Sequence, residues 1–229
     1  YDALADTRAL LEQAGVRAVG AGPDAEAARE FAVLRAGGVR LAVVGVTDHP
    51  DDFAAGPGRP GVALAELRNG VPDWLTALVA RAADAADAVL VTPHWGPNMT
   101  ARPPAYVRRA AEELLAAGAT WIAGHSAHVF HGVADRVAYD MGDFVDDYAI
   151  DPELRNDLGL LFLVTLSGPD PAHCRPVRLE ALPLHLDYCR TVPARGAERE
   201  WIRHRFSHAC AGLGTSVTEH GGRLRVEWG

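Results

Sequence analysis

The 229-residue sequence has only three cysteines, Cys174, Cys189 and Cys210. Their number is odd and no pair has C-x-x-C spacing, which excludes a disulfide framework and a recognisable zinc–thiolate site. We therefore expect all three to be small core-filling residues of a protein in a reducing compartment.

An excess of basic residues is also missing, because the formal net charge is −8. A nucleic-acid-binding face needs a basic patch, so nucleic acid is not an expected partner. No apolar run approaches the roughly 18 residues of a membrane-spanning helix, and no signal peptide, P-loop, G-x-S-x-G or G-x-G-x-x-G motif is present. What remains is an ordinary globular composition, 48% hydrophobic and 23% charged.

Helix and strand patterns alternate through the first two-thirds of the chain. Phe31–Arg35 and Val39–Val46 flank Ala36-Gly37-Gly38, which predicts a β-hairpin whose second arm is a central strand. Apolar residues with helical spacing follow Pro103-Pro104 and predict an amphipathic helix, namely Val107, Ala110, Ala111, Leu114 and Leu115.

The last third is richer in strands. Leu160–Leu166 and Val177–Leu186 are expected to be long antiparallel strands, followed by a helix over about 197–213 and a terminal hairpin through Gly221-Gly222. We interpret residues 1–229 as a single domain with a layered α/β sandwich fold. The chain opens at Tyr1 inside a helical pattern, so Tyr1 is expected to be an internal residue of a longer protein.

Three polar clusters lie between Pro93 and Tyr148, and a packing argument alone would not predict them. The first two, Pro93–Asn98 and Gly124–His128, each follow a short apolar run, which places histidines at the ends of buried strands. The third, Tyr139–Tyr148, is acidic. Neutral imidazole is a common metal ligand, so these clusters predict a metal site.

His94, His125 and His128 are the predicted metal ligands. His125 and His128 are separated by two residues at a turn, so both rings can point at one ion. Ser126 between them offers a hydroxyl either to a substrate or to the groups that surround the metal ligands. Trp95 is interpreted either as the wall of a substrate pocket or as a core residue.

The acidic cluster has three possible roles: coordinating a cation, binding a cationic group or capping turns. Arg155 nearby either neutralises these carboxylates or holds a substrate carboxylate or phosphate. The other seven histidines lack such company in the sequence, and His204 with His208 is interpreted as a solvated helix face. These seven are His49, His131, His173, His185, His204, His208 and His220.

Three motifs in this order and spacing resemble the bacterial CapA family, which is named for capsule and poly-γ-glutamate synthesis. They are His94-Trp95-Gly96, Gly124-His125-Ser126-Ala127-His128-Val129 and Tyr139-Asp140-Met141-Gly142-Asp143-Phe144. The similarity extends over Asp2–Val145, and the resemblance implies membership of the calcineurin-like metallophosphoesterase superfamily.

The resemblance implies a four-layer α/β/β/α sandwich of the metallophosphoesterase type that lacks its N-terminal portion here. It also implies two divalent metal ions, Mn, Fe or Zn, whose other ligands would lie upstream of Tyr1. The chain departs from the family pattern at Asn98, where Glu is frequent, at Asp143, where Asn is frequent, and at His131, where Gln is frequent.

From this the expected function is metal-assisted hydrolysis of a phosphoester or a γ-glutamyl amide, with an anionic small molecule or polymer as substrate. Asn98 and Asp143 are the predicted catalytic residues, and Trp95, Ser126 and Arg155 the predicted substrate-binding residues. One alternative is a metal-independent binding or assembly component of a polymer-synthesis machine. Another is a purely structural use of His125 and His128. The location, cytoplasmic or cell-envelope associated, is left open, and membrane contact is expected only through an N-terminal anchor outside this sequence.

Overall fold

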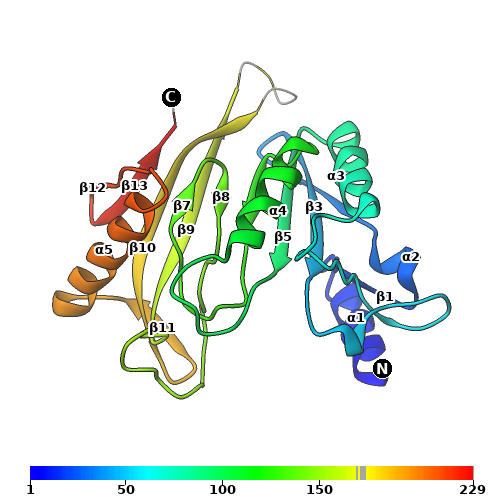
Figure 1. The fold of residues 1–229 in the computed structure, drawn as a ribbon, viewed down its shortest axis with the longest axis horizontal. Coiled ribbons are helices and arrows are strands. Elements are labelled where there is room, and N and C mark those ends of the chain that lie inside the picture. Colours follow the sequence, from blue (N-terminus) through cyan, green and yellow to red (C-terminus); the bar gives the residue numbers. More distant parts are fainter. Residues whose placement is uncertain (169, 171–173, 229) are drawn as a thin grey trace.

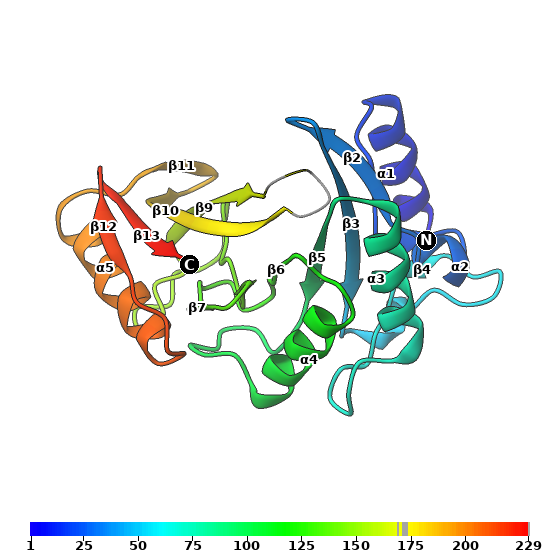
Figure 2. The same cartoon turned by 90° about the horizontal axis from the view of Figure 1, so that it is seen from above.

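The computed structural model describes residues 1–168, 170 and 174–228. Within these residues, two large β-sheets and five α-helices form a mixed α/β fold (Figures 1 and 2), which confirms the predicted fold class at that level. His173 lies outside the described residues.

The first sheet has six strands in the order β2-β3-β5-β6-β8-β7. The hairpin prediction is confirmed, because β2 (Ala32–Ala36) pairs antiparallel with β3 (Val39–Thr47). Strands β3, β5, β6 and β8 run parallel, so their carboxyl ends lie at one edge. The remaining strands of the sheet are β5 (Ala88–His94), β6 (Trp121–Ala123), β7 (Val133–Ala134) and β8 (Val137–Ala138).

Helices α3 (Asp73–Ala85) and α4 (Ala105–Ala116) cover one face of this sheet. The predicted apolar stripe of α4 is confirmed, because Val107, Ala110, Ala111 and Leu114 are buried against the sheet. Smaller elements precede these helices: α1 (Asp2–Gln13), β1 (Ala21–Gly22), α2 (Ala25–Ala28), a 3₁₀ turn (Asp51–Phe53) and β4 (Gly61–Val62).

The second sheet is antiparallel and contains the predicted long strands, β9 (Leu158–Ser167) and β10 (Arg175–Asp187). Beyond β9, strand β10 also pairs with β11 (Arg190–Pro193) and β13 (Arg223–Glu227). The predicted terminal hairpin is present as β12 (Thr218–His220) and β13, and helix α5 spans Gly196–Ala211.

Two hydrophobic cores lie on opposite faces of the first sheet. Alternation along β6 points Ile122 into the core beneath α3 and α4, whereas Trp121 and Ala123 enter the core shared with the second sheet. Phe206 of α5 joins this second core, with ring centroids 6.3 Å from Phe130 and 6.0 Å from Phe162. Helix α5 therefore contacts both the second sheet and the loop beside β7.

The cysteine prediction is correct for one residue and wrong for another. Cys210 of α5 is fully buried in the second core, whereas Cys189 is exposed in the turn between β10 and β11. Among the residues that the structure describes, no helix combines the length and the apolar character needed to cross a membrane.

Candidate functional site at the carboxyl ends of the parallel strands

Strand register brings the polar clusters together. Thr47 pairs with His94 at the ends of β3 and β5, and His94 forms a parallel bridge with His125 just beyond β6. The carboxyl ends of parallel strands are the usual place for binding sites in α/β folds. The segments that follow β3, β5 and β6 therefore meet at one edge, as the sequence predicted for the last two.

His94 and His125 form the centre of this site. Their Nδ1 atoms lie 3.0 Å apart, so one donates a hydrogen bond to the other, and their ring centroids are 5.1 Å apart. Burial lowers the pKa of His94 below its usual value and, with the nearby His94 charge, lowers that of His125 to about 4. Both rings are therefore neutral near pH 7, the form in which imidazole offers a lone pair to a metal.

His128 is held by a carboxylate. Its Nδ1 lies 3.1 Å from both carboxylate oxygens of Asp143, and the ring of Tyr148 packs against it edge-on. Burial raises the pKa of Asp143 to about 6 even though His128 lies beside it. This carboxylate orients the ring of His128 and leaves its Nε2 available.

Asp48 and His49, which the sequence did not predict for the site, also lie there. His49 was set apart as a histidine without company, and the structure corrects this, because its ring centroid lies 4.9 Å from that of His94. Its Nδ1 forms a hydrogen bond with the carboxylate of Asp48, the residue before it. A carboxylate at Nδ1 fixes the imidazole orientation and turns Nε2 toward the site.

Two further hydrogen bonds fix the carboxylate of Asp48. Its Oδ2 accepts hydrogen bonds from the backbone N–H of Gly96 at 3.0 Å and from the Tyr106 hydroxyl at 3.1 Å. Burial, together with Asp48, raises the pKa of Tyr106 to about 12, so this hydroxyl remains a donor. The strand-end rule that identified His94 would also have found Asp48 and His49, which directly follow β3.

Ser126 and Asn98 lie between these groups. The Ser126 hydroxyl donates to the carbonyl of Gly96 at 2.8 Å and lies 3.5 Å from Nε2 of His49 and 3.4 Å from Oδ1 of Asn98. Ser126 is buried, so its hydroxyl serves contacts within the protein. The structure thus brings both predicted residues to the histidines.

The backbone around the histidines is strained. Ser126 has φ 134° and His128 has φ 61°, and Met99 on the facing loop has φ 51°. The two loops are joined by a hydrogen bond from the Met99 N–H to the Ala127 carbonyl at 3.1 Å. Left-handed conformations of residues other than glycine cost about 1–3 kcal/mol each and gather at functional sites, where surrounding contacts hold them.

The acidic cluster is mainly a scaffold. Both oxygens of the buried Asp140 accept backbone hydrogen bonds at 2.8 Å, one from Ala127 and one from Gly142. Burial raises the pKa of Asp140 to about 7. Asp146 accepts from the Tyr148 N–H at 2.8 Å. For these two residues the structure supports the turn-capping alternative.

Two predicted substrate-binding residues make contacts within the protein instead. Trp95 is 2% exposed and donates its indole N–H to the Tyr139 carbonyl at 2.8 Å, so the structure supports its core-filling alternative. Arg155 pairs through two nitrogens with Asp157, each at 2.7 Å, and lies over the Trp201 ring. Neither Asp157 nor Trp201 belongs to the histidine site.

The donor set suits a transition metal but is incomplete. Neutral imidazoles and carboxylates are ligands for Zn, Mn and Fe, and His94 with His125 offers two of them. Among the described residues, however, no group of three or more His, Cys, Asp or Glu side chains is arranged to hold an ion. The described residues thus offer single donors of the right chemistry but no complete set of ligands.

Fold and site together define an α/β protein with a histidine-rich site at the ends of its parallel strands. Residues 1–148, which include this whole site, match the family described as bacterial capsule synthesis protein PGA_cap. This match covers more than half of the chain, so the chain belongs to that family, as the CapA resemblance predicted.

Curated relatives agree with this assignment. The chain is 33% identical over 234 residues to a "Probable polyglutamine synthesis accessory protein" of Mycobacterium tuberculosis, an alignment covering 95% of this chain and 60% of the relative. It is 30% identical over 150 residues to the "PGA biosynthesis protein CapA" of Bacillus subtilis, covering 63% of this chain and 38% of the relative. The chain thus spans only part of the length of these relatives.

A solved structure of a hypothetical protein from Thermus thermophilus aligns over 71% of this chain and 58% of that chain. Its TM-score is 0.30 at 15% sequence identity, which is too small a similarity to inform the fold.

Proposed function

We propose that this chain supplies the histidine half of a two-metal hydrolase site that acts on a phosphoester or a γ-glutamyl amide in capsule or poly-γ-glutamate metabolism. The observation that carries the proposal is the pair of neutral, half-buried imidazoles of His94 and His125 at neighbouring strand ends. The family membership and the names of the relatives support the polymer context.

The proposed architecture is the four-layer α/β/β/α metallophosphoesterase sandwich. A six-stranded sheet covered by α3 and α4, with an antiparallel sheet behind it, supports this arrangement. In this proposal the other ligands come from a part of the natural protein outside this sequence, which aligns with 60% of the length of the mycobacterial relative.

In this proposal His94, His125 and His128 would hold the metal ions, and bound metal would supply a lowered water pKa and stabilisation of charge on the attacked group. Asp143 fixes the ring of His128 through Nδ1. Asn98 orients the substrate or a nearby water through its amide, and Ser126 holds the loop carrying Asn98 in place.

Asp48 and His49 have a separate role in the proposed reaction. Asp48 accepts at Nδ1 of His49, so Nε2 faces Ser126 and the cluster and can carry a proton to or from a leaving group. The ordering of Asp48 by Gly96 and Tyr106 keeps this pair in one orientation.

Hydrolysis assays test the proposal. The protein with its natural N-terminus, loaded with Mn, Fe or Zn, is expected to cleave an aryl phosphodiester or a γ-glutamyl anilide. His94→Ala should lower kcat/KM by about 100-fold or more, since it removes a ligand. The exposed His220 gives the control, because His220→Ala should retain full activity. Equal activity of the two variants, or no cleavage with any of the metals, would contradict the proposal.

The second candidate is the metal-independent binding or assembly role. It is favoured by the incomplete donor set of the described residues and by a basic cavity on the same chain. In that case His94→Ala would leave polymer binding and polymer production unchanged.

A further inference from the structure

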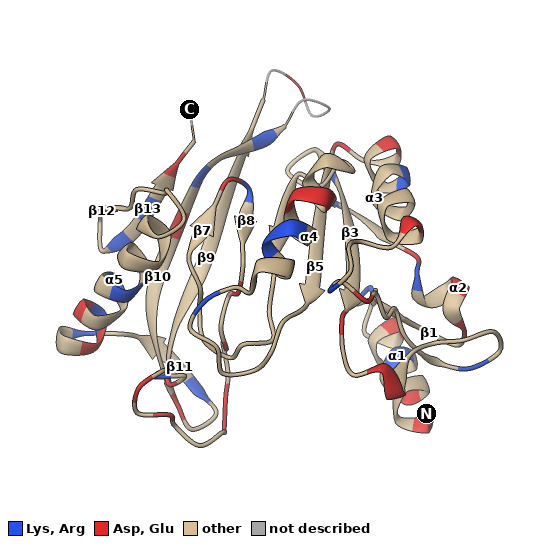
Figure 3. Ribbon diagram, in the orientation of Figure 1, with Lys and Arg blue, Asp and Glu red and all other residues tan. Residues whose placement is uncertain are grey.

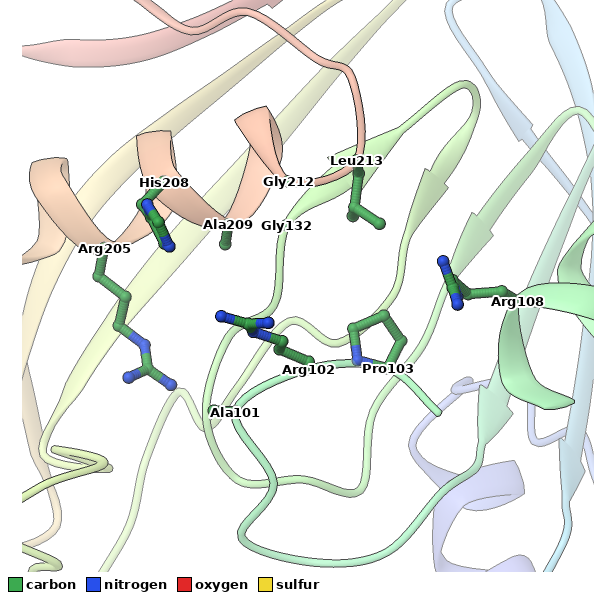
Figure 4. A pocket seen from close by; sticks show the side chains of 10 residues that line it. All are labelled: Ala101, Arg102, Pro103, Arg108, Gly132, Arg205, His208, Ala209, Gly212 and Leu213. Carbon is green, nitrogen blue, oxygen red and sulfur yellow. The ribbon is translucent and has the colours of Figure 1, made fainter. Parts of the chain in front are cut away.

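A cavity of about 450 Å³ lies between α5, the start of α4 and the loop before α4, and its lining includes none of His94, His125 and His128. Figure 4 shows Arg205 and His208 on α5, Arg102 on the loop and Arg108 on α4 around this hollow. Gly132 forms part of the wall, and α5 packs so closely there that a Cβ at Gly132 would meet the backbone of Ala209 at 2.5 Å.

The cavity is basic although the protein is acidic. Within the described part of the chain, none of the residues lining it is Asp or Glu, whereas three are arginines. The net charge of the whole protein is −8, so the cavity lining has the opposite sign to the protein as a whole; Figure 3 marks the positions of Arg in blue and of Asp and Glu in red along the ribbon. The sequence contains no lysine, and arginine is the residue best suited to hold oxyanions through two parallel hydrogen bonds.

Aromatic rings, rather than a carboxylate, hold the guanidinium of Arg205 in place. Its guanidinium stacks over Phe130 and Trp201, with centroid distances of 5.6 and 5.2 Å. Its Nη2 is buried and has no hydrogen-bond partner among the described residues, and burial lowers the pKa of Arg205. A buried, unsatisfied donor of this kind is costly unless a ligand completes it.

One loop connects the cavity to the histidine site. Asn98 and Met99 contact Ser126 and Ala127 at the histidines, and Ala101–Pro103 line the cavity a few residues later. The ring of His131, also buried, hydrogen-bonds the carbonyl of Thr100 at 2.7 Å between the two places. The same short segment, 98–103, therefore carries contacts of the histidine site at one end and lining residues of the cavity at the other.

We infer that this cavity binds successive carboxylates of an anionic polymer, a γ-linked glutamate chain, and so holds the substrate next to the histidine site. The inference rests on the proposed function for the choice of polymer. Arg205, Arg102 and Arg108 supply the contacts, and the volume suits a few residues of chain.

Fluorescence anisotropy with a labelled γ-glutamate oligomer tests this in the natural-length protein. Arg102→Gln/Arg108→Gln replaces two exposed side chains without described ion pairs, so the variant should fold and bind about tenfold more weakly or worse. Arg205→Gln should weaken binding similarly. The control, Arg17→Gln/Arg35→Gln, removes the same charge from exposed sites elsewhere and should bind like the wild type.

Equal binding by both double variants would overturn the inference, as would equal binding of an uncharged γ-glutamine oligomer. Binding of inorganic pyrophosphate with no binding of the glutamate oligomer would overturn the assignment to carboxylates. His94→Ala/His125→Ala separates this from the proposed hydrolysis, because it should abolish cleavage and leave oligomer binding intact. Arginine-dependent binding without any cleavage would leave the cavity site standing and reject the hydrolase.

Discussion

Replacing Gly124 by alanine is expected to destabilise the protein by about 3–5 kcal/mol. A Cβ at this position would lie 2.2 Å from Nε1 of Trp95 and 2.3 Å from the carbonyl oxygen of Tyr139. It would occupy the place of the 2.8 Å hydrogen bond between those two groups. The backbone of Gly124 cannot move away, because its N–H bonds Ala138 and its carbonyl bonds Met141. Urea denaturation followed by tryptophan fluorescence measures the loss.

Gly56→Ala is the matched control. A Cβ there meets only the Arg59 side chain, at an ordinary 3.5 Å, so the free energy of unfolding should change by less than about 0.5 kcal/mol. A Gly124→Ala protein as stable as Gly56→Ala would show that the described approach of Trp95 and Tyr139 to Gly124 is wrong.

Asp140→Ala is expected to cost about 2–5 kcal/mol, because it leaves the N–H groups of Ala127 and Gly142 buried without their acceptor. The cost should depend on pH. The folded pKa of Asp140, about 7, is above the unfolded value of 3.8, so the wild type loses stability as pH rises from about 4 to about 7. Alanine removes that loss, and the variant's deficit should be larger at pH 5 than at pH 8.

Urea denaturation of the wild type and of Asp140→Ala at pH 5 and at pH 8 gives the stability deficit of the variant at each pH. Asp147 is exposed in the same segment, so Asp147→Ala is the control and should differ little from the wild type at either pH. An Asp140→Ala deficit that grows between pH 5 and pH 8 would contradict the buried, raised-pKa carboxyl.

Elements with a strong periodic pattern were predictable from the sequence. The hairpin of β2 and β3, the face of α4 and the pair β9–β10 all follow from local alternation or helical spacing. The position of α5 against both sheets was not, because it depends on long-range contacts of Phe206 with Phe130 and Phe162. The description of residues 1–229 as one domain stays a prediction.

The part of the site that directly follows an apolar strand pattern could be predicted from the sequence. His94, His125, Ser126 and Asn98 come together as expected, because neighbouring parallel strands end at the same edge. Asp48 and His49 were missed because the sequence after β3 is rich in Asp, Gly and Pro and therefore indicates a surface loop. These two residues are the first of that segment, and the pattern does not distinguish them from the rest of the loop. For Trp95 the sequence left two roles open, and only the fold shows that its indole is buried.

Metal content tests the central claim most directly. The protein with its natural N-terminus, purified after Mn or Fe supplementation, is analysed for metal beside its His94→Ala/His125→Ala variant. We predict about two equivalents of transition metal in the wild type and a clear fall in the variant, with the variant still folded by circular dichroism. A folded wild-type protein that holds no metal under these conditions would contradict the metal-dependent hydrolase and leave the binding role.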